Sequence, residues 1–249
     1  MRNIVGIILA GGKGSRYKFG QYKFLSEYKG KFLLVRIIEE MLPNVQRIAI
    51  VTPPENSEIK NILKDYPDIE YVIQKKPLGT GHALLSTDFL FENTRTTLLV
   101  SYADKPLITA KTFKNLIDQH IQNSADITIA TAILPFPGSK GRIIRVNGKF
   151  AGVVEAKDAT EEILKIKEVN AGFIVCESET VYKELRKIKN NNAAGEYYLT
   201  DVYTEYLKDG LKIHTVKIPP EESCDINTVE ELTRIEEWIK LVKNHSQKQ

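Results

Sequence analysis

Residues 4–16 read IVGIILAGGKGSR, an apolar run that ends abruptly in three glycines, a lysine and an arginine. The run Ile4–Leu9 has no polar alternation, which is typical of a strand covered on both faces, and such strands belong to parallel sheets. The glycines that follow let the backbone turn sharply and approach a ligand, so that amide N–H groups can face an anion while the two basic side chains add positive charge. We interpret the stretch as a buried strand opening into a phosphate-binding loop, with an ordinary glycine-rich turn as the alternative. The candidate nucleotide-binding residues of this loop are Leu9, Ala10, Gly11, Gly12, Lys13, Gly14, Ser15 and Arg16.

Two familiar nucleotide-binding motifs do not fit this loop. A P-loop needs G-K-[ST] at its end, whereas this loop ends Gly14-Ser15-Arg16, which argues against a Walker-type nucleoside triphosphatase. The dinucleotide fingerprint needs G-x-G-x-x-G and an acid at the tip of the second strand. The second apolar run ends instead in Pro53-Pro54, so a Rossmann dehydrogenase is disfavoured.

Length and composition favour one globular domain. The chain has 249 residues, of which 42% are hydrophobic and 27% charged, enough to bury a sizeable core. No run of about 18 apolar residues could span a bilayer, and the N-terminus lacks the apolar region of a signal peptide, so we expect a soluble cytoplasmic protein with no membrane partner. The balance of 35 basic and 32 acidic residues disfavours a nucleic-acid polymer as partner. Solitary Cys176 and Cys224, and histidines without metal-ligand spacing, indicate neither a disulfide framework nor a zinc site, and the oligomeric state stays open.

Strand-like and helical patterns alternate along the chain. This alternation implies βαβ units and a mostly parallel central sheet with helices on both faces, in which ligands bind beyond the carboxyl ends of the strands. We therefore predict an α/β, Rossmann-like fold formed by a single domain over residues 1–244, followed by a polar tail at residues 245–249. Besides the first strand, the predicted strands are Arg47–Val51, Glu70–Ile73, Thr97–Tyr102, Ile127–Leu134, Val169–Cys176 and Leu211–Ile218, and the predicted helices are Phe32–Leu42, Glu55–Lys64, Thr80–Phe91, Lys111–Asn123, Thr180–Ile188, Glu196–Lys208 and Asn227–Lys243.

The alternation is interrupted after Gly141. Two apolar runs, Arg142–Val146 and Phe150–Glu155, flank the dipeptide Asn147-Gly148. Asn-Gly between apolar runs is a strong hairpin signal, because both residues tolerate the positive φ of a tight turn. We therefore predict an antiparallel hairpin flap beside the parallel sheet.

Seven segments of the chain, in the same order, match a known enzyme family. Over Ile4 to about Leu232 the chain resembles the pyrophosphorylase (uridylyltransferase) domain of bifunctional N-acetylglucosamine-1-phosphate uridylyltransferases, and so the sugar-1-phosphate nucleotidyltransferases with their MobA-like NTP transferase domain. Each segment is modest alone, but seven in family order are highly specific. The segments are LAGGKGSR (Leu9–Arg16), QKKPLGTGHA (Gln74–Ala83), YADKPLI (Tyr102–Ile108), GRIIR (Gly141–Arg145), VVEAKDAT (Val153–Thr160), EVNAGF (Glu168–Phe173) and NNAAGEYYLTD (Asn191–Asp201).

The resemblance implies a Mg²⁺-dependent reaction between a nucleoside triphosphate and a phosphorylated small-molecule acceptor. A sugar-1-phosphate oxygen attacks the α-phosphate in line, and pyrophosphate leaves. The protein needs no nucleophile of its own, because it has only to position two polyanions and neutralise developing charge. The 249 residues contain no hexapeptide repeats for acetyl-CoA, so we expect nucleotidyl transfer without acetyl transfer.

The resemblance also assigns the nucleotide side of the site. Arg16, with Lys13, would hold the β- and γ-phosphates. The alternative is that these two residues form a solvated basic turn. Lys23 aligns with the family lysine on the α-phosphate, although Tyr22 stands where the family usually has proline. The glutamine that reads the uracil edge corresponds to Gln74, which could otherwise merely end a strand. Gly79 and Thr80 would support the base.

Asp104 and Asn227 match the two metal ligands of the family. Asp104 follows a buried strand, where a carboxylate can bind Mg²⁺ and leave other positions to phosphates and water. The alternative for Asp104 is a cap before Pro106, and Ala103 replaces the glycine that usually precedes this aspartate. The implied catalytic residues are thus Arg16, Lys23 and Asp104. The residues matched to the acceptor sugar are Gly141, Glu155, Asn170, Tyr198 and Thr200.

Three alternatives remain after this comparison. A glycosyltransferase of the related nucleotide-sugar fold would need a D-x-D motif, whereas this strand ends Asp104-Lys105-Pro106. A non-catalytic nucleotide-binding protein is disfavoured because the chain keeps the matched lysine and both metal ligands. The substrate pair is open: UTP with N-acetylglucosamine-1-phosphate is favoured, but Asp225-Ile226-Asn227-Thr228 resembles the D-[IV]-[ND]-T segment of cytidylyltransferases and molybdenum-cofactor nucleotidyltransferases. That resemblance allows CTP and a different phosphorylated acceptor, for surface polysaccharide or cofactor biosynthesis.

Overall fold

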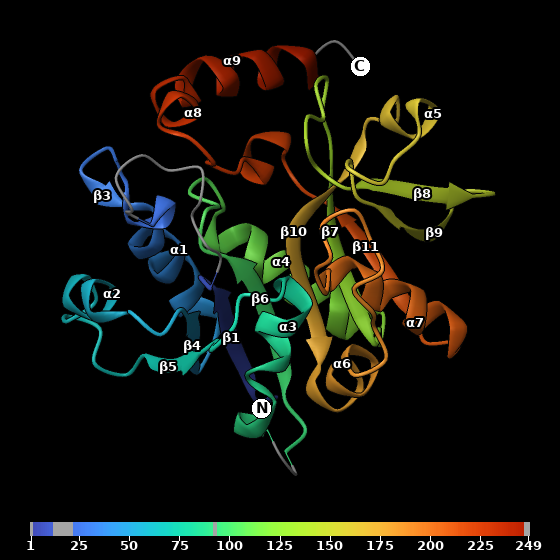
Figure 1. Cartoon of the computed structure of the whole chain (residues 1–249). Coiled ribbons are helices and arrows are strands. Elements are labelled where there is room, and N and C mark those ends of the chain that lie inside the picture. Colours follow the sequence, from blue (N-terminus) through green and yellow to red (C-terminus); the bar gives the residue numbers. More distant parts are fainter. Residues whose placement is uncertain (1, 12–21, 92–93, 247–249) are drawn as a thin grey trace.

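Strand β1 (Ile4–Leu9) lies at the centre of a nine-stranded sheet in the computed structural model, which describes residues 2–11, 22–91 and 94–246 (Figure 1). The other strands of this sheet are β4 (Arg47–Thr52), β5 (Glu70–Ile73), β6 (Thr97–Tyr102), β7 (Ile127–Ile133), β8 (Arg142–Val146), β9 (Lys149–Val154), β10 (Glu168–Glu177) and β11 (Ile213–Lys217), and a small separate sheet pairs β2 (Glu27–Tyr28) with β3 (Lys31–Phe32). The helices are α1 (Leu33–Met41), α2 (Ser57–Ile62), α3 (Thr80–Leu85), α4 (Ala110–Gln122), α5 (Glu161–Leu164), α6 (Ser178–Leu185), α7 (Val202–Lys208), α8 (Val229–Thr233) and α9 (Ile235–Ser246).

The sheet is mixed but mostly parallel, as the alternation of the sequence predicts. Its main path runs β11-β7-β10-β6-β1-β4-β5. β1 pairs in parallel with β4 and β6, β4 with β5, and β7 with β11, whereas β10 is antiparallel to β6 and β7. The other strands of this path therefore share one direction, and the loops that follow β1, β5 and β6 meet at one edge.

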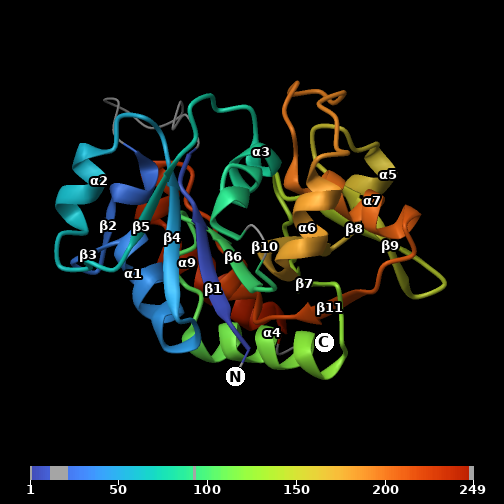
Figure 2. The same cartoon turned by 90° about the horizontal axis from the view of Figure 1, so that it is seen from below.

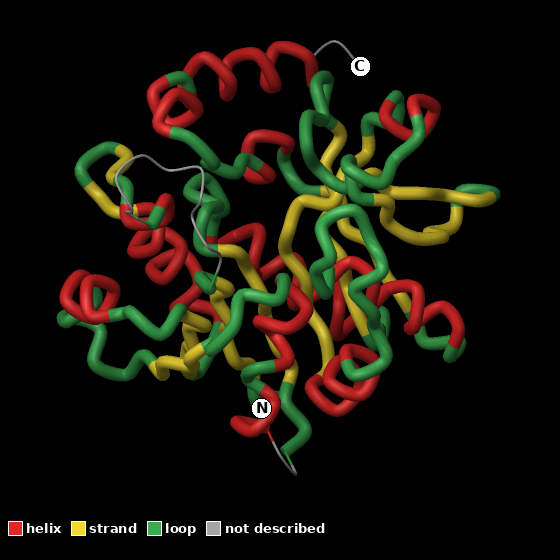
Figure 3. Tube along the Cα trace, in the orientation of Figure 1, coloured by secondary structure: helices red, strands yellow, loops and turns green. Residues whose placement is uncertain are grey.

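Helices cover both faces of the sheet, which explains why the strands lack polar alternation. Ile8 of β1 packs into the core on one face with side chains of α1, α2, α4 and α9. Val5, Ile7 and Leu9 pack on the other face with side chains of α3, α6 and α7. Figure 2 shows α4 along one side of the sheet and α3 and α6 on the other, and Figure 3 shows the strands in yellow with helices in red around them. The predicted α/β fold class is confirmed.

The predicted hairpin is present and projects from the side of the sheet (Figure 1). β8 and β9 pair antiparallel, and β8 also contacts β10 through the pair Arg142 and Val169. The turn residues Asn147 and Gly148 have φ angles of 50° and 76°, the left-handed values that a two-residue hairpin turn requires. The turn thus has the chemistry that Asn-Gly predicts.

Three predicted helices are interrupted or begin with a 3₁₀ turn. The expected helix 80–91 ends as α3 at Leu85 and is followed by a 3₁₀ turn at Asp88–Phe91, and residues 227–243 split into α8 and α9. The expected helix 196–208 begins with a 3₁₀ turn at Leu199–Asp201, and α7 follows. α9 extends to Ser246, three residues beyond the expected helix end at Lys243. In the part of the chain that the structure describes, no helix is long and apolar enough to cross a membrane.

Candidate active site

A cavity of about 570 Å³ opens at the edge where the parallel strands end. It is bounded by the segments that follow β1, β5, β6 and β9, by β10 and by the segment before α8. Thr200 does not itself line the cavity, but it donates a hydrogen bond to the cavity-lining Glu155, at Oε1, at 2.8 Å. Gly12, Lys13, Gly14, Ser15 and Arg16 lie outside the described residues. The predicted site residues that line the cavity are Leu9, Ala10, Gly11, Lys23, Gln74, Gly79, Thr80, Asp104, Gly141, Glu155, Asn170, Tyr198 and Asn227.

Gln74 is buried at the end of β5 and its amide has a defined orientation. Its Nε2 donates to the carbonyl oxygen of Gly79 at 3.1 Å and lies 2.9 Å from His82 Nδ1. Because a carbonyl can only accept, the amide nitrogen must face Gly79, and Oε1 is left as the acceptor group. No described residue donates to that oxygen. It lies against Gly11, where a Cβ would come within 2.2 Å of Oε1, so a side chain at position 11 would displace the glutamine.

Gly79 and Thr80 join the end of β5 to a distant part of the chain. Gly79 has φ 119°, and a Cβ there would meet the Tyr197 carbonyl oxygen at 2.5 Å. Thr80 Oγ1 accepts from the Leu199 N–H at 2.9 Å, and Gly81 N donates to Tyr197 O at 2.8 Å. These contacts hold Tyr197 and Tyr198 outside the helix beside the cavity, which is why helical structure begins later than expected.

Lys23 brings the two metal-ligand candidates together. Its ammonium group donates to Asp104 Oδ2 and, at 2.9 Å, to Asn227 Oδ1. The oxygens of Asp104 and Asn227 therefore converge on one cationic group, the Lys23 ammonium. Asp104 Oδ1 is buried and receives no hydrogen bond from any described residue. A second oxygen of a buried carboxylate without a donor suits a cation, so these residues fit a hard metal such as Mg²⁺.

The charge of Asp104 is stabilised by neighbouring lysines. Burial alone would raise the pKa of Asp104, but the ammonium groups of Lys23 and Lys105 outweigh it, and the pKa of this carboxyl lies below its usual range. Asp104 is therefore a carboxylate at neutral pH. A carboxylate, rather than the neutral acid, is the form that coordinates a divalent cation.

Sequence reasoning did not predict a group of three charged residues in the cavity wall, Lys105, Lys140 and Asp225. Asp225 forms an ion pair with Lys140 through Oδ1 and accepts from Asn227 Nδ2 at 3.0 Å through Oδ2, so it orients the Asn227 amide. Burial lowers the pKa of both lysines, with the charge of Asp104 opposing the shift at Lys105 and the charge of Lys105 adding to it at Lys140. Their adjacency to the matched residues Asp104 and Gly141 was the available signal.

The opposite wall combines a half-buried carboxylate, Glu155, with backbone groups. Burial raises the pKa of Glu155, and the hydrogen bond from Thr200 opposes that shift. A Cβ on Gly141 would lie 3.2 Å from Glu155 Oε1, so glycine leaves the carboxylate open to the cavity. The Gly141 carbonyl accepts from the Asn170 N–H at 2.9 Å, and Asn170 Oδ1 accepts from Gly172 N at 3.1 Å. This wall offers acceptors and amide N–H groups suited to sugar hydroxyls.

Comparisons with known proteins agree with this geometry. The chain is 38% identical over 224 residues to the bifunctional protein GlmU of Lactobacillus johnsonii, covering 89% of this chain and 48% of that protein. It is 36% identical over 237 residues to the GlmU of Clostridium novyi, covering 94% of this chain and 52% of that protein. The chain thus spans about half the length of these curated relatives, and it matches their pyrophosphorylase part.

A solved structure and a family model complete the comparison. A Bacillus anthracis protein assigned as a glucose-1-phosphate thymidylyltransferase superposes with a TM-score of 0.77 over 95% of both chains at 18% identity, which shows a shared fold. The model of the MobA-like NTP transferase domain matches residues 6–140. Since that match covers more than half of the chain and includes Gln74 and Asp104, the chain belongs to the MobA-like NTP transferase family.

Proposed function

We propose that the protein transfers a nucleotidyl group from a pyrimidine nucleoside triphosphate, with UTP favoured, to a sugar-1-phosphate such as N-acetylglucosamine-1-phosphate. The products are a nucleotide-sugar and pyrophosphate. The observation that carries this proposal is the convergence of Lys23, Asp104 and Asn227 in the cavity. A lysine beside two oxygen ligands provides the cation and the metal site that in-line phosphoryl chemistry needs.

Each of the site residues would contact a different part of the substrates. Mg²⁺ held by Asp104 and Asn227 would neutralise charge on the phosphates and the leaving pyrophosphate. Metal binding would release the Lys23 ammonium from these two oxygens, so that it could donate to an α-phosphate oxygen. Arg16 and Lys13 of the first loop would hold the β- and γ-phosphates. Since the acceptor phosphate is already an anionic nucleophile, no general base is required.

The orientation of Gln74 supports a base that carries an N–H donor. Uracil presents N3–H to an acceptor, and Gln74 Oε1 is the amide group left free when Nε2 binds Gly79. Cytosine in the same pose would place its N3 acceptor against that oxygen. Two acceptors that face each other leave both without a hydrogen bond, and such unpaired groups discriminate strongly between substrates, which is why UTP is preferred in this proposal.

The opposite wall supports a sugar as acceptor. Glu155 lies near Gly141, the Gly141 carbonyl accepts from the Asn170 N–H, and Asn170 and Tyr198 both line the cavity. Carboxylate and amide groups can bind sugar hydroxyl groups, and the hydrogen bond from Thr200 orients the Glu155 carboxylate. The N-acetyl group of the acceptor would complete the contact with this wall.

A pyrophosphate-release screen tests the proposal. The purified chain would be incubated with Mg²⁺, each of the four ribonucleoside triphosphates, and N-acetylglucosamine-1-phosphate, glucose-1-phosphate or other phosphorylated acceptors. Release that requires UTP, a sugar-1-phosphate and Mg²⁺ together supports it. Preference for ATP or GTP would contradict the proposed pyrimidine specificity. Tight nucleotide binding in calorimetry without turnover on any acceptor would instead identify a non-catalytic binding protein.

A cytidylyltransferase is the second candidate. The segment Asp225-Ile226-Asn227-Thr228 supports it, since this pattern resembles that of cytidylyltransferases. Under this alternative, Gln74 would flip and donate to cytosine N3, which requires the loss of its bond to Gly79. The ratio of kcat/KM for UTP and CTP separates the two candidates.

A further inference from the structure

Two buried lysines in the cavity wall, Lys105 and Lys140, have no role in the reaction described so far. Their side chains are 5% and 11% exposed, and both line the cavity. Burying an ammonium group is costly unless anions or carbonyl groups surround it. Two such groups side by side therefore need an explanation.

The contacts of the two lysines within the protein are incomplete. Both donate to the Ser223 carbonyl, Lys105 at 3.2 Å and Lys140 at 2.9 Å. Asp225 Oδ1 pairs with Lys140 and lies 3.8 Å from Lys105 Nζ, so two ammonium groups share one carboxylate. Each ammonium has three N–H donors. Among the described residues, Lys105 has only the Ser223 carbonyl and the Lys140 side chain as hydrogen-bond partners, which leaves a donor for a ligand.

The pair lies between the metal-ligand candidates and the sugar wall. Lys105 directly follows Asp104, and Lys140 directly precedes Gly141. Gly172 has φ 86°, and a Cβ there would lie 2.8 Å from Lys105 Cε, so the backbone of β10 leaves room for this lysine beside the cavity. A group bound to both ammonium groups would lie where a sugar wall and a metal site meet.

We propose that Lys105 and Lys140 bind the phosphate group of the acceptor, a phosphomonoester dianion. Three lysine side chains, these two and Lys23, lie against the two carboxylates Asp104 and Asp225, so this part of the cavity wall has one more basic than acidic group. Charge-assisted hydrogen bonds from ammonium to phosphate are strong and directional. The inference rests on the proposed nucleotidyl transfer, and it assigns the residues that would aim the attacking oxygen.

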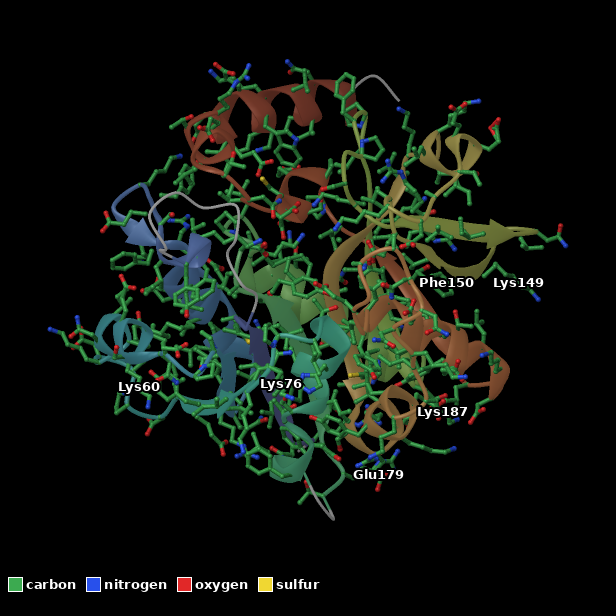
Figure 4. The ribbon with its side chains drawn as sticks, viewed as in Figure 1. Lys60, Lys76, Lys149, Phe150, Glu179 and Lys187 are labelled. Atoms are coloured by element: carbon green, nitrogen blue, oxygen red, sulfur yellow. The ribbon has the colours of Figure 1, made fainter. Side chains whose placement is uncertain are left out.

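Direct binding tests this assignment without turnover. The affinities of inorganic phosphate and N-acetylglucosamine-1-phosphate would be measured by calorimetry without nucleotide or metal. Lys105→Met and Lys140→Met should each weaken both affinities by about 10- to 100-fold, the range for losing a hydrogen bond to a charged group. Nucleotide affinity should change by no more than about twofold. Lys149→Met is the matched control, because Lys149 lies exposed at the tip of the β8–β9 hairpin (Figure 4).

Asp225→Asn distinguishes ligand binding from a structural tether. If the lysines serve an anion, Asp225 competes with it, and Asp225→Asn should tighten phosphate binding by about two- to fivefold, the effect of removing a partly exposed ion pair. If the lysines only anchor the 223–225 segment, Asp225→Asn and Lys140→Met should both weaken binding. If phosphate affinity rises in Asp225→Asn and falls in Lys140→Met, the proposal is supported. If it falls in both variants, the proposal is overturned.

The remaining outcomes are also decisive. Unchanged phosphate binding in both methionine variants overturns the proposal, as does loss of nucleotide or pyrophosphate affinity with acceptor affinity intact. Where a methionine variant fails to fold, Lys105→Arg and Lys140→Arg keep the charge, and retained phosphate binding together with the Asp225→Asn result decides the matter. If no nucleotide is turned over but phosphate binding depends on the lysines, the proposed function fails while this inference stands.

Discussion

Asp104 is the residue whose replacement tests the metal site most directly. Asp104→Asn removes the anionic charge without changing side-chain volume, and it should lower kcat by about a hundredfold or more, because several kcal/mol of charge stabilisation are lost. Steady-state pyrophosphate release at saturating Mg²⁺ measures the effect, and circular dichroism checks the fold. Asp118→Asn, an exposed carboxylate on α4, is the matched control. Near wild-type kcat in folded Asp104→Asn would reduce Asp104 to a structural residue.

Lys23 and Arg16 should differ in the kinetic parameter that each affects. Lys23→Ala should depress kcat far more than it raises the KM for nucleotide, because charge on the α-phosphate develops mainly in the transition state. Arg16→Ala should show the larger KM effect, since it would hold ground-state phosphates. Lys31→Ala, a partly exposed lysine of β3, is the control. The reverse pattern would exchange the two roles.

Among single residues, those that match the family could be predicted from the sequence, whereas Lys105 and Lys140 could not. Gln74, Asp104 and Asn227 are matched by family segments, and the fold brings all three to one cavity. Lys105 and Lys140 could not be predicted as a pair, because their proximity depends on a Ser223 carbonyl that is distant in sequence from both. Two charged residues that each stand next to a different motif cannot be recognised as a pair until the fold shows that they are close in space.

Among the elements, the start of α8 controls the position of Asn227. Thr228 caps this helix by accepting from the Glu231 N–H at 3.1 Å, so Asn227 stays outside the helix and faces Lys23. Thr228→Ala should lower the free energy of unfolding by about 1 kcal/mol and also weaken Mg²⁺ activation several-fold. Thr160→Ala removes the corresponding cap of α5, far along the chain from Asn227, and should affect stability alone. Equal Mg²⁺ dependence in both variants would contradict the role of this cap.

Most of the helices were predictable from periodicity, whereas the start of α7 was not. Periodicity placed a helix at 196–208, but the backbone of Tyr197 is engaged with Leu78 and Gly81, and the α-helix starts only at Val202. Such long-range backbone pairing leaves no trace in local periodicity. The hairpin behaved differently, since Asn147-Gly148 specifies its own turn.

At the scale of the whole molecule, a buried polar cluster joins several elements at the sheet edge opposite the cavity. Glu177 at the end of β10 accepts from Thr97 Oγ1 of β6 at 3.0 Å and lies 3.1 Å from His120 Nε2 of α4. His120 Nδ1 lies 3.1 Å from Thr128 Oγ1 of β7. The cluster therefore ties the antiparallel strand to both of its neighbours and to a covering helix.

Glu177 should make folding stability depend on acid pH. Burial by itself would raise the pKa of Glu177, but the hydrogen bonds from His120 and Thr97 outweigh it, and its pKa lies below the usual carboxyl range. A carboxyl whose pKa is lowered by folding stabilises the protein above its unfolded pKa, and that stability is lost as the pH falls through the folded pKa. Glu177→Gln should therefore cost about 1–3 kcal/mol in urea unfolding at pH 7 and flatten the fall in stability below about pH 4.3. Glu179→Gln, an exposed carboxyl two residues along in α6 (Figure 4), is the control and should leave both unchanged. If Glu177→Gln matched wild type at pH 7, or kept the full acid dependence, the cluster would not be what holds β10 between its neighbours.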